Sequence, residues 1–168
     1  ARLALLALRV KYAPTEAQYL FGSTVVIGAI SGLVAVEFHL SIRAAEHLLI
    51  DRALAATGNS WVAWTLVTPT LGGLVAGAAL TWLVPAARGS GIPQVKQAFA
   101  TPGVRIRFRD AVGKFVLSVV QIGSGASLGR EGPTVFLCAG VASLLARVTP
   151  LGAKSRHRLI PVGVAAGI

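Results

Sequence analysis

The chain has 168 residues, of which 13% are charged and 54% are hydrophobic, with 19 glycines in addition. Soluble domains carry about 25% charged residues, so this composition excludes a disordered segment and a typical soluble enzyme and indicates a membrane-embedded protein. The net charge of +10 would suggest a nucleic-acid partner in a soluble chain. Here the basic residues are placed as in the cytoplasmic loops of membrane proteins, so no nucleic-acid partner is expected.

Three features of the composition bear on the completeness and the cross-linking of the chain. The single cysteine, Cys138, excludes an intrachain disulfide framework. The sequence contains no methionine, and residues 162–168 form an apolar run without a polar stop. We therefore expect residues 1–168 to be an excerpt of a longer protein.

Two long uncharged stretches predict membrane-spanning helices. Residues 17–36 contain no charge over twenty residues, which is about the length that an α-helix needs to cross roughly 30 Å of hydrocarbon. Residues 53–87 form a longer uncharged stretch, in which the helix is expected to start near Ser60 or Trp61 and to end before Pro85. Both helices should therefore cross the bilayer.

Two shorter uncharged runs follow, residues 115–129 and 132–146, each of fifteen residues. Neither is long enough to span a bilayer comfortably alone. Arg130 and Glu131 lie between them. This pattern predicts two shortened helices that meet at a polar break, which membrane proteins tolerate where the break lines an enclosed or watery cavity.

The distribution of charge predicts the topology. Three segments are rich in Lys and Arg: residues 1–16, 88–114 and 147–158. By the positive-inside rule these segments are cytoplasmic, whereas residues 37–52, with three acids against two arginines, lie outside. The chain is thus predicted to be a multi-pass integral membrane protein. Arg130 and Glu131 should lie toward the outer side.

A first candidate anion site is the segment Gly89-Ser90-Gly91-Ile92-Pro93. Glycine permits unusual backbone angles, and proline suits the first turn of a helix. A helix that begins near Ile92 would direct free N–H groups and the positive end of its dipole toward Ser90, whose hydroxyl adds a donor. The alternative is a loop followed by a capped helix without a ligand.

A second candidate is Gly129-Arg130-Glu131-Gly132-Pro133, where glycine and proline again open a helix. A carboxylate beside a helix N-terminus can accept N–H bonds, and a mobile anion could compete for the same place. Ionisable groups between apolar segments are functional candidates in membranes. The alternative is a local ion pair between Arg130 and Glu131 at the membrane interface.

The two motifs, about forty residues apart, together with Gly113-Lys114-Phe115 and the glycine-rich residues 123–129, resemble the CLC family of chloride channels and proton-coupled chloride antiporters. The resemblance extends from about residue 17 to residue 168 and implies the N-terminal part of a CLC-type transmembrane domain. The implied fold is an all-α polytopic helical bundle with short and broken helices. The resemblance implies anion-binding positions at Ser90, Gly91, Ile92, Gly129, Arg130, Glu131 and Gly132.

The resemblance also implies a function. Ser90 would contact chloride, and Glu131 would be the gate and the proton acceptor. We expect chloride transport coupled to proton counter-transport by a homodimer in the cell (inner) membrane, with chloride as cargo and no cofactor. A passive, voltage- or pH-gated channel is the alternative, and a fluoride/proton antiporter is disfavoured because Ser90 fits the chloride-type motif.

Two positions depart from the family pattern. The first motif is often followed by glutamate, where this chain has Gln94, and Phe136 replaces a polar residue that often follows the second motif. The change at Gln94 affects a flank of the first motif and not its proposed ligands. Phe136 leaves the lining beyond the second motif open.

Alternatives outside transport are weaker. Residues 125–129 fit the nucleophile-elbow pattern G-x-S-x-G, and Ser127, Glu131 and His157 have the chain order of a hydrolase triad. An elbow requires a strand before the serine, whereas residues 115–122 predict a membrane helix, so we expect no enzyme. A structural membrane segment without transport is the remaining alternative. His39 and His47 lack metal-ligand spacing, so we expect no metal site, and Cys138 is expected to pack in the interior.

Overall fold

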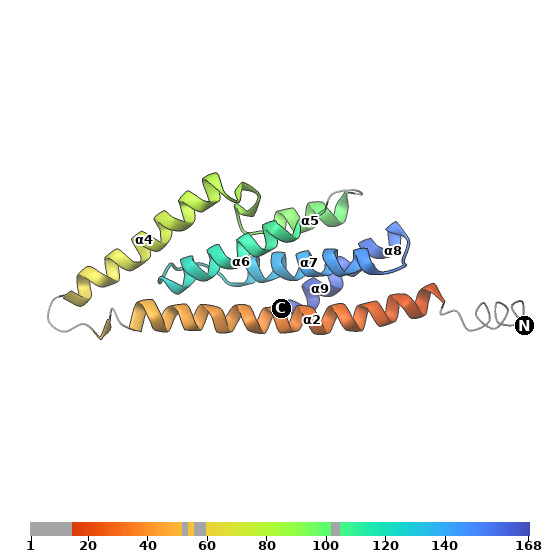
Figure 1. Ribbon diagram of the computed structural model, residues 1–168, viewed down its shortest axis with the longest axis horizontal. Coiled ribbons are helices and arrows are strands. Elements are labelled where there is room, and N and C mark those ends of the chain that lie inside the picture. The colour runs from red at the N-terminus through yellow and green to blue at the C-terminus, as the bar shows by residue number, and fades with distance from the viewer. Residues whose placement is uncertain (1–14, 52–53, 56–59, 102–104) are drawn as a thin grey trace, which may run out of the picture.

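The computed structural model describes residues 15–51, 54–55, 60–101 and 105–168, and this part of the chain is helical without a strand. It forms an elongated bundle in which several helices run along the long axis (Figure 1). The elements are α2 (Glu16–Glu46), the π-helix η1 (His47–Asp51), α4 (Ser60–Trp82), the 3-10 helix η2 (Pro85–Ala87), α5 (Ile92–Ala100), α6 (Phe108–Gly123), α7 (Glu131–Val148), α8 (Ala153–His157) and α9 (Leu159–Gly167). The prediction of an all-α bundle with short and broken helices is confirmed.

Three helices in the described part of the chain are long and apolar enough to cross a membrane: α2 with η1, α4, and α7. Helix α4 begins at Ser60, as predicted, and ends at Trp82, before Pro85. Helix α7 matches the predicted run of residues 132–146 and extends it by one residue at its start and two at its end.

Helix α2 is longer than the predicted span. Thr15 and Gln18 form a capping box at its start, in which the Thr15 N–H donates to Gln18 Oε1 at 2.9 Å. The helix then continues through most of residues 37–52, which the sequence analysis set apart as an outer segment. Charges at Glu37 and Arg43 do not end it, because both side chains are exposed and both residues favour helix. Its 31 residues span roughly 46 Å, so it must tilt or project beyond the hydrocarbon.

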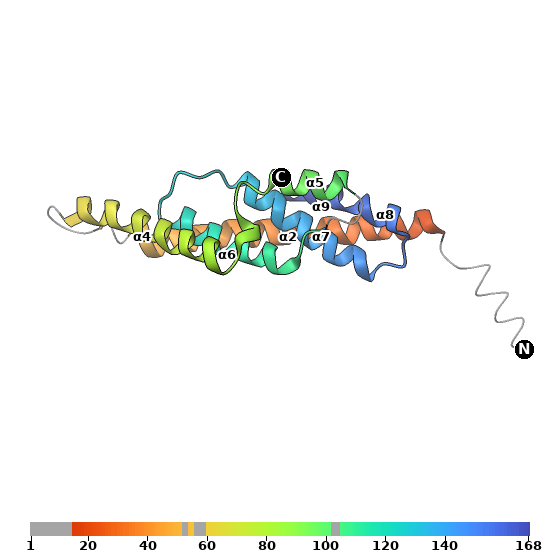
Figure 2. The same cartoon turned by 90° about the horizontal axis from the view of Figure 1, so that it is seen from above.

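Helix α7 lies at the centre of the bundle. Thirteen of its 18 residues are buried, and it packs against α2, α6 and α9, as both views show (Figures 1 and 2). Cys138 is fully buried, and its Sγ lies 3.5 Å from the Ser31 carbonyl oxygen. This placement confirms the expectation that Cys138 is a packing residue.

Small residues allow the helices around α7 to approach closely. A Cβ atom on Gly163 of α9 would lie 2.6 Å from Ala142 Cβ and 2.7 Å from the Cys138 carbonyl oxygen, and one on Gly140 would lie 2.7 Å from Ala111 Cβ. Such close backbone approach is typical of helix packing in lipid, where dispersion contacts replace the hydrophobic effect between helices.

The outer helices expose large apolar side chains. Helix α4 buries only Gly72 and Ala76, while Trp82 is 79% exposed, and Phe21 of α2 is 73% exposed. An exposed apolar surface of this extent indicates that these helices contact lipid hydrocarbon or further protein.

The polar break is displaced relative to the prediction. Helix α6 starts at Phe108, inside the basic segment, and not at residue 115, since Asp110 in its first turn complements the helix dipole and Arg109 stays exposed. It ends at Gly123, and residues 124–130 form a loop that leads back to the start of α7 (Figure 2). The loop is therefore seven residues long and not a two-residue interruption.

We expect Gly163→Ala to destabilise the full-length protein, because the added methyl group would collide with Ala142 and the Cys138 carbonyl. Overpacking of this kind costs about 1–3 kcal/mol, against a gain of about 0.5–1 kcal/mol from replacing a helical glycine. The control is Gly22→Ala, since no described atom lies within 4 Å of the added group. Thermal unfolding in detergent should show a lower Tm for Gly163→Ala only; equal shifts would contradict this packing.

Candidate functional site

The first motif opens α5 as the sequence predicted. Gly89 and Gly91 have φ angles of +76° and +95°, which side-chain-bearing residues rarely adopt. The first helical bond runs from the Val95 N–H to the Gly91 carbonyl at 3.1 Å, and none of the described side chains caps this helix. The amides of Ile92 and Gln94 therefore lack intrahelical partners.

The second motif opens α7 in the same way. The Thr134 N–H donates to the Arg130 carbonyl at 3.1 Å, and the Thr134 hydroxyl donates to the same oxygen at 2.7 Å. No described side chain caps the N-terminus. The amides of Glu131 and Gly132 are free of intrahelical bonds, and Pro133 has no N–H to satisfy. The start of α7 thus carries partial positive charge, and Glu131 is the acidic residue of its first turn.

The structure brings the two motifs into direct contact. A Cβ atom on Gly132 would lie 2.5 Å from the Ser90 carbonyl oxygen, and one on Gly91 would lie 2.7 Å from Phe136 Cβ. The loop of residues 124–130 carries the start of α7 back beside the start of α5 (Figures 1 and 2). Only glycine leaves room for this approach at positions 91 and 132.

This contact corrects one part of the predicted topology, the separation of the two motifs. The charge pattern placed the first motif in the cytoplasmic segment 88–114 and Arg130 with Glu131 toward the outer side. Contact between Ser90 and Gly132 excludes opposite membrane faces for the two motifs. Charge counting assigns a side to each charged segment but not the depth at which a helix begins, and residues 124–130 return along the bundle before α7 begins (Figure 2).

The polar side chains at this junction are accessible. Ser90, Arg130 and Glu131 are exposed in the described structure, while Gly91 and Gly132 are buried. No ion pair joins Arg130 to Glu131 among the described residues. The structure therefore does not support the alternative of a local ion pair, and Arg130 does not fix the position of the Glu131 carboxylate.

Lys114 is a positioning residue that the sequence analysis used only as part of the family resemblance. It is buried on α6, and its Nζ donates to the Ala87 carbonyl at 2.9 Å and also to the Gly89 carbonyl. Both bonds hold the turn that precedes Ser90. A lone lysine at the edge of an otherwise uncharged run was the signal that could have revealed this role, because a charge there needs buried partners.

Gln94 and Phe136, the two departures from the family pattern, support the same junction. The Gln94 side chain donates from Nε2 to the Arg88 carbonyl at 2.7 Å, while its Oε1 is buried without a partner among the described residues. Phe136 is 3% exposed and lies against Gly91. Gln94 therefore holds α5 to the residue that precedes the first motif, and Phe136 packs α7 against Gly91.

The hydrolase arrangement does not form. Ser127 lies in the loop that follows helix α6, so no strand precedes it, and His157 belongs to α8 at the opposite end of the long axis (Figures 1 and 2). Within the described ranges no group of three metal-binding side chains occurs. His47 contacts Asp51 one turn away on η1.

The chain is similar to known membrane proteins. A family model described as voltage gated chloride channel matches residues 72–168. A putative chloride channel protein ClcB-like of Ralstonia nicotianae is 33% identical over 149 residues, which cover 84% of this chain and 35% of that protein. The H(+)/Cl(-) exchange transporter ClcA of Salmonella arizonae is 29% identical over 146 residues, covering 85% and 31%. The chain spans about a third of the length of these relatives.

We expect Lys114→Met to loosen the turn before Ser90, because two bonds to backbone carbonyls are lost. Net losses of this kind are about 1–3 kcal/mol, so amides of residues 85–95 should exchange hydrogen roughly tenfold faster by mass spectrometry. The control is Lys96→Met, which removes an exposed lysine on α5. Unchanged exchange in Lys114→Met would contradict the positioning role.

Proposed function

The chain belongs to the voltage gated chloride channel (CLC) family, and from that premise we propose that the full-length protein moves chloride across a membrane in exchange for protons. The observation that carries the proposal is the meeting of two helix N-termini, α5 and α7, at Ser90 and Gly132. Neither N-terminus is capped by a described side chain. Free amides from both helices are thus available to one ligand.

The electrostatics of this junction suit a monovalent anion. Each helix N-terminus contributes about half a positive charge through its free N–H groups, and anions bind readily at such ends. The ligands that we propose are amide dipoles and a hydroxyl, all of them uncharged groups. Such a site stabilises a dehydrated anion without trapping it, which transport requires.

Ser90 is proposed to donate its hydroxyl to the bound chloride. It is held by positive-φ glycines on both sides, by Lys114 beneath the preceding turn, and by close contact with Gly132. The backbone at Gly91, Ile92, Gly129, Arg130 and Gly132 is proposed to complete the pathway. This assignment rests on the family resemblance together with the junction geometry.

Glu131 is proposed to be the gate and the proton acceptor. It occupies the first position of α7, where its carboxylate can accept the same amide bonds as an anion. Protonation removes the charge and allows the side chain to leave. The carboxylate and chloride would then compete for one place, which couples proton uptake to anion movement.

A passive chloride channel is the second candidate. The ClcB-like relative, at 33% identity, is described as a putative chloride channel. The same junction could conduct chloride in a channel, in which Glu131 would open and close the pathway without transferring a proton across the membrane. By resemblance to the family, we also propose a homodimer in the cell's inner membrane.

We expect Glu131→Gln to leave chloride flux intact and to abolish its pH dependence and any proton coupling, because the amide side chain cannot titrate. The measurement is chloride and proton flux from liposomes that contain the full-length protein. Glu37→Gln, at an exposed acid on α2, should behave as the wild type. A Glu131→Gln protein that keeps the wild-type pH dependence refutes the gate, and one that moves no chloride refutes the competition.

We expect Ser90→Val to weaken chloride binding by roughly ten- to a hundredfold, because a hydrogen bond to a charged group is worth about 1.5–3 kcal/mol. Calorimetry with chloride, together with flux selectivity among halides, measures the effect. The matched control is Ser127→Val, in the exposed loop before α7. Equal affinities for both variants would sink the proposed role of Ser90.

A further inference from the structure

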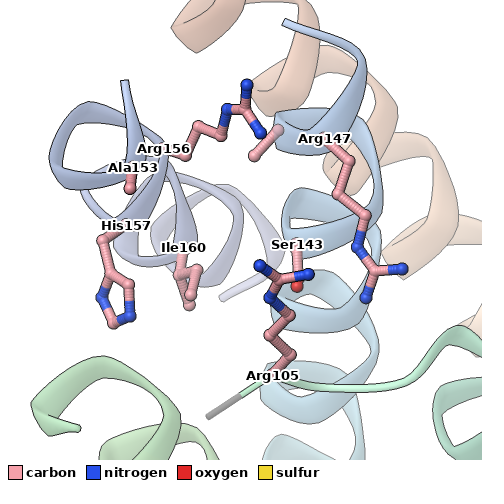
Figure 3. A pocket seen from close by; sticks show the side chains of 8 residues that line it. Arg105, Ser143, Arg147, Ala153, Arg156, His157 and Ile160 are labelled. Carbon is pink, nitrogen blue, oxygen red and sulfur yellow. The ribbon is translucent and has the colours of Figure 1, made fainter. Parts of the chain in front are cut away.

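A cavity of about 130 Å³ lies away from the junction, among the C-terminal half of α7, helix α8, the start of α9 and the segment before α6 (Figure 3). A single ordered water needs only about 10–15 Å³, so the space admits a polyatomic ligand. The lining residues are Arg105, Ser143, Ala146, Arg147, Ala153, Arg156, His157 and Ile160.

Three arginines from separate parts of the chain line this cavity, and none of the lining residues is acidic. Arg105 rises from the segment before α6 toward Ser143, and Arg147 lies one turn further along the same helix as that serine (Figure 3). In the described part of the chain, neither Arg105 nor Arg147 makes an ion pair or a side-chain hydrogen bond. Both side chains are exposed, as is that of Arg156, so their guanidinium donors are accessible to a ligand that enters from solvent.

Two further polar side chains line the cavity beside the arginines. The Ser143 side chain is buried at 8% exposure, and His157 Nε2 is buried with no hydrogen-bond partner within the described ranges. Arg156 is anchored through Nε, which donates to the Leu151 carbonyl at 2.7 Å, so its terminal nitrogens remain available. A buried polar atom normally has a partner, so the unpaired His157 Nε2, beside the accessible arginine donors, indicates a ligand that forms several hydrogen bonds.

The positive-inside rule explains why this region is basic but not why its arginines converge. Lys154 and Arg158 belong to the same basic segment and do not line the cavity. Arg105, by contrast, comes from a segment about forty residues earlier in the chain and meets Arg147 and Arg156 around one space. Convergence of three elements on one cavity is the arrangement of a binding site.

We propose that this cavity binds a phosphate group. Guanidinium forks match the paired oxygens of phosphate, and two or more arginines can each engage one edge of the same tetrahedral anion. Phosphate offers several oxygens, so each guanidinium fork can pair with its own edge of the anion, whereas a halide is a single acceptor atom that all the donors would have to share. The site is distinct from the junction of Ser90 and Gly132, so its test does not depend on chloride transport.

The test is isothermal titration of the full-length protein in detergent with inorganic phosphate at constant ionic strength. Arg105→Gln and Arg147→Gln should each weaken binding about tenfold, since each removes charge-assisted bonds. Arg147→Lys, which keeps the charge but loses the fork, should also weaken it. The control Arg107→Gln removes an arginine two residues from Arg105 that does not line the cavity, and it should bind as the wild type.

Two further titrants distinguish the source of the phosphate. Tighter binding of ATP than of inorganic phosphate identifies a soluble ligand, whereas tighter binding of short-chain phosphatidic acid identifies a lipid headgroup; either result supports the site if Arg147→Gln abolishes the preference. Three outcomes overturn the proposal: no binding of any titrant, as expected if carboxylates elsewhere in the full chain pair these arginines; equal weakening in Arg107→Gln; or displacement of phosphate by chloride at equal concentration.

Discussion

The close approach of Gly132 to the Ser90 backbone is the constraint on which the rest of the arrangement depends. A Cβ atom at position 132 would lie 2.5 Å from the Ser90 carbonyl oxygen, so the two helix N-termini can meet only because this position is glycine. That contact places the first turns of α5 and α7, with Ser90 and Glu131, next to each other. Lys114 and Gln94 donate to backbone carbonyls just before Ser90, and Phe136 packs against Gly91.

The contact depends on the central position of α7 in the helical bundle. Membrane helices gain little from burying apolar surface against one another, because lipid is equally apolar, so close packing through small residues must hold them. Gly140 and Gly163 provide that closeness along α7. The long outer helices α2 and α4 face outward with apolar side chains, so the interior of the bundle is left to α7 and to the polar junction at its start.

Sequence reasoning predicted the helical class, the span of α4, the two helix-opening motifs and the burial of Cys138, because length, hydropathy and glycine–proline punctuation are local signals. It misplaced the end of α2 and the start of α6, since charges at Glu37 and Arg109 do not stop a helix. The family resemblance grouped Ser90 with Glu131, but the charge count placed them on different sides of the membrane, because the return of residues 124–130 depends on tertiary packing that local charge does not report. The bonds of Lys114 and the cavity around Arg147 could not be predicted from the sequence, because they form between residues that are far apart in the chain.

The central claim is that one anion is held jointly by the N-termini of α5 and α7. A crystal of the full-length protein carrying Glu131→Gln, soaked in bromide, tests it most directly through the anomalous signal of the ion. The account predicts a bromide peak within hydrogen-bonding reach of the Ser90 hydroxyl and the amides at the start of α7. Bromide bound elsewhere in the crystal, with no peak between Ser90 and Gly132, would contradict it.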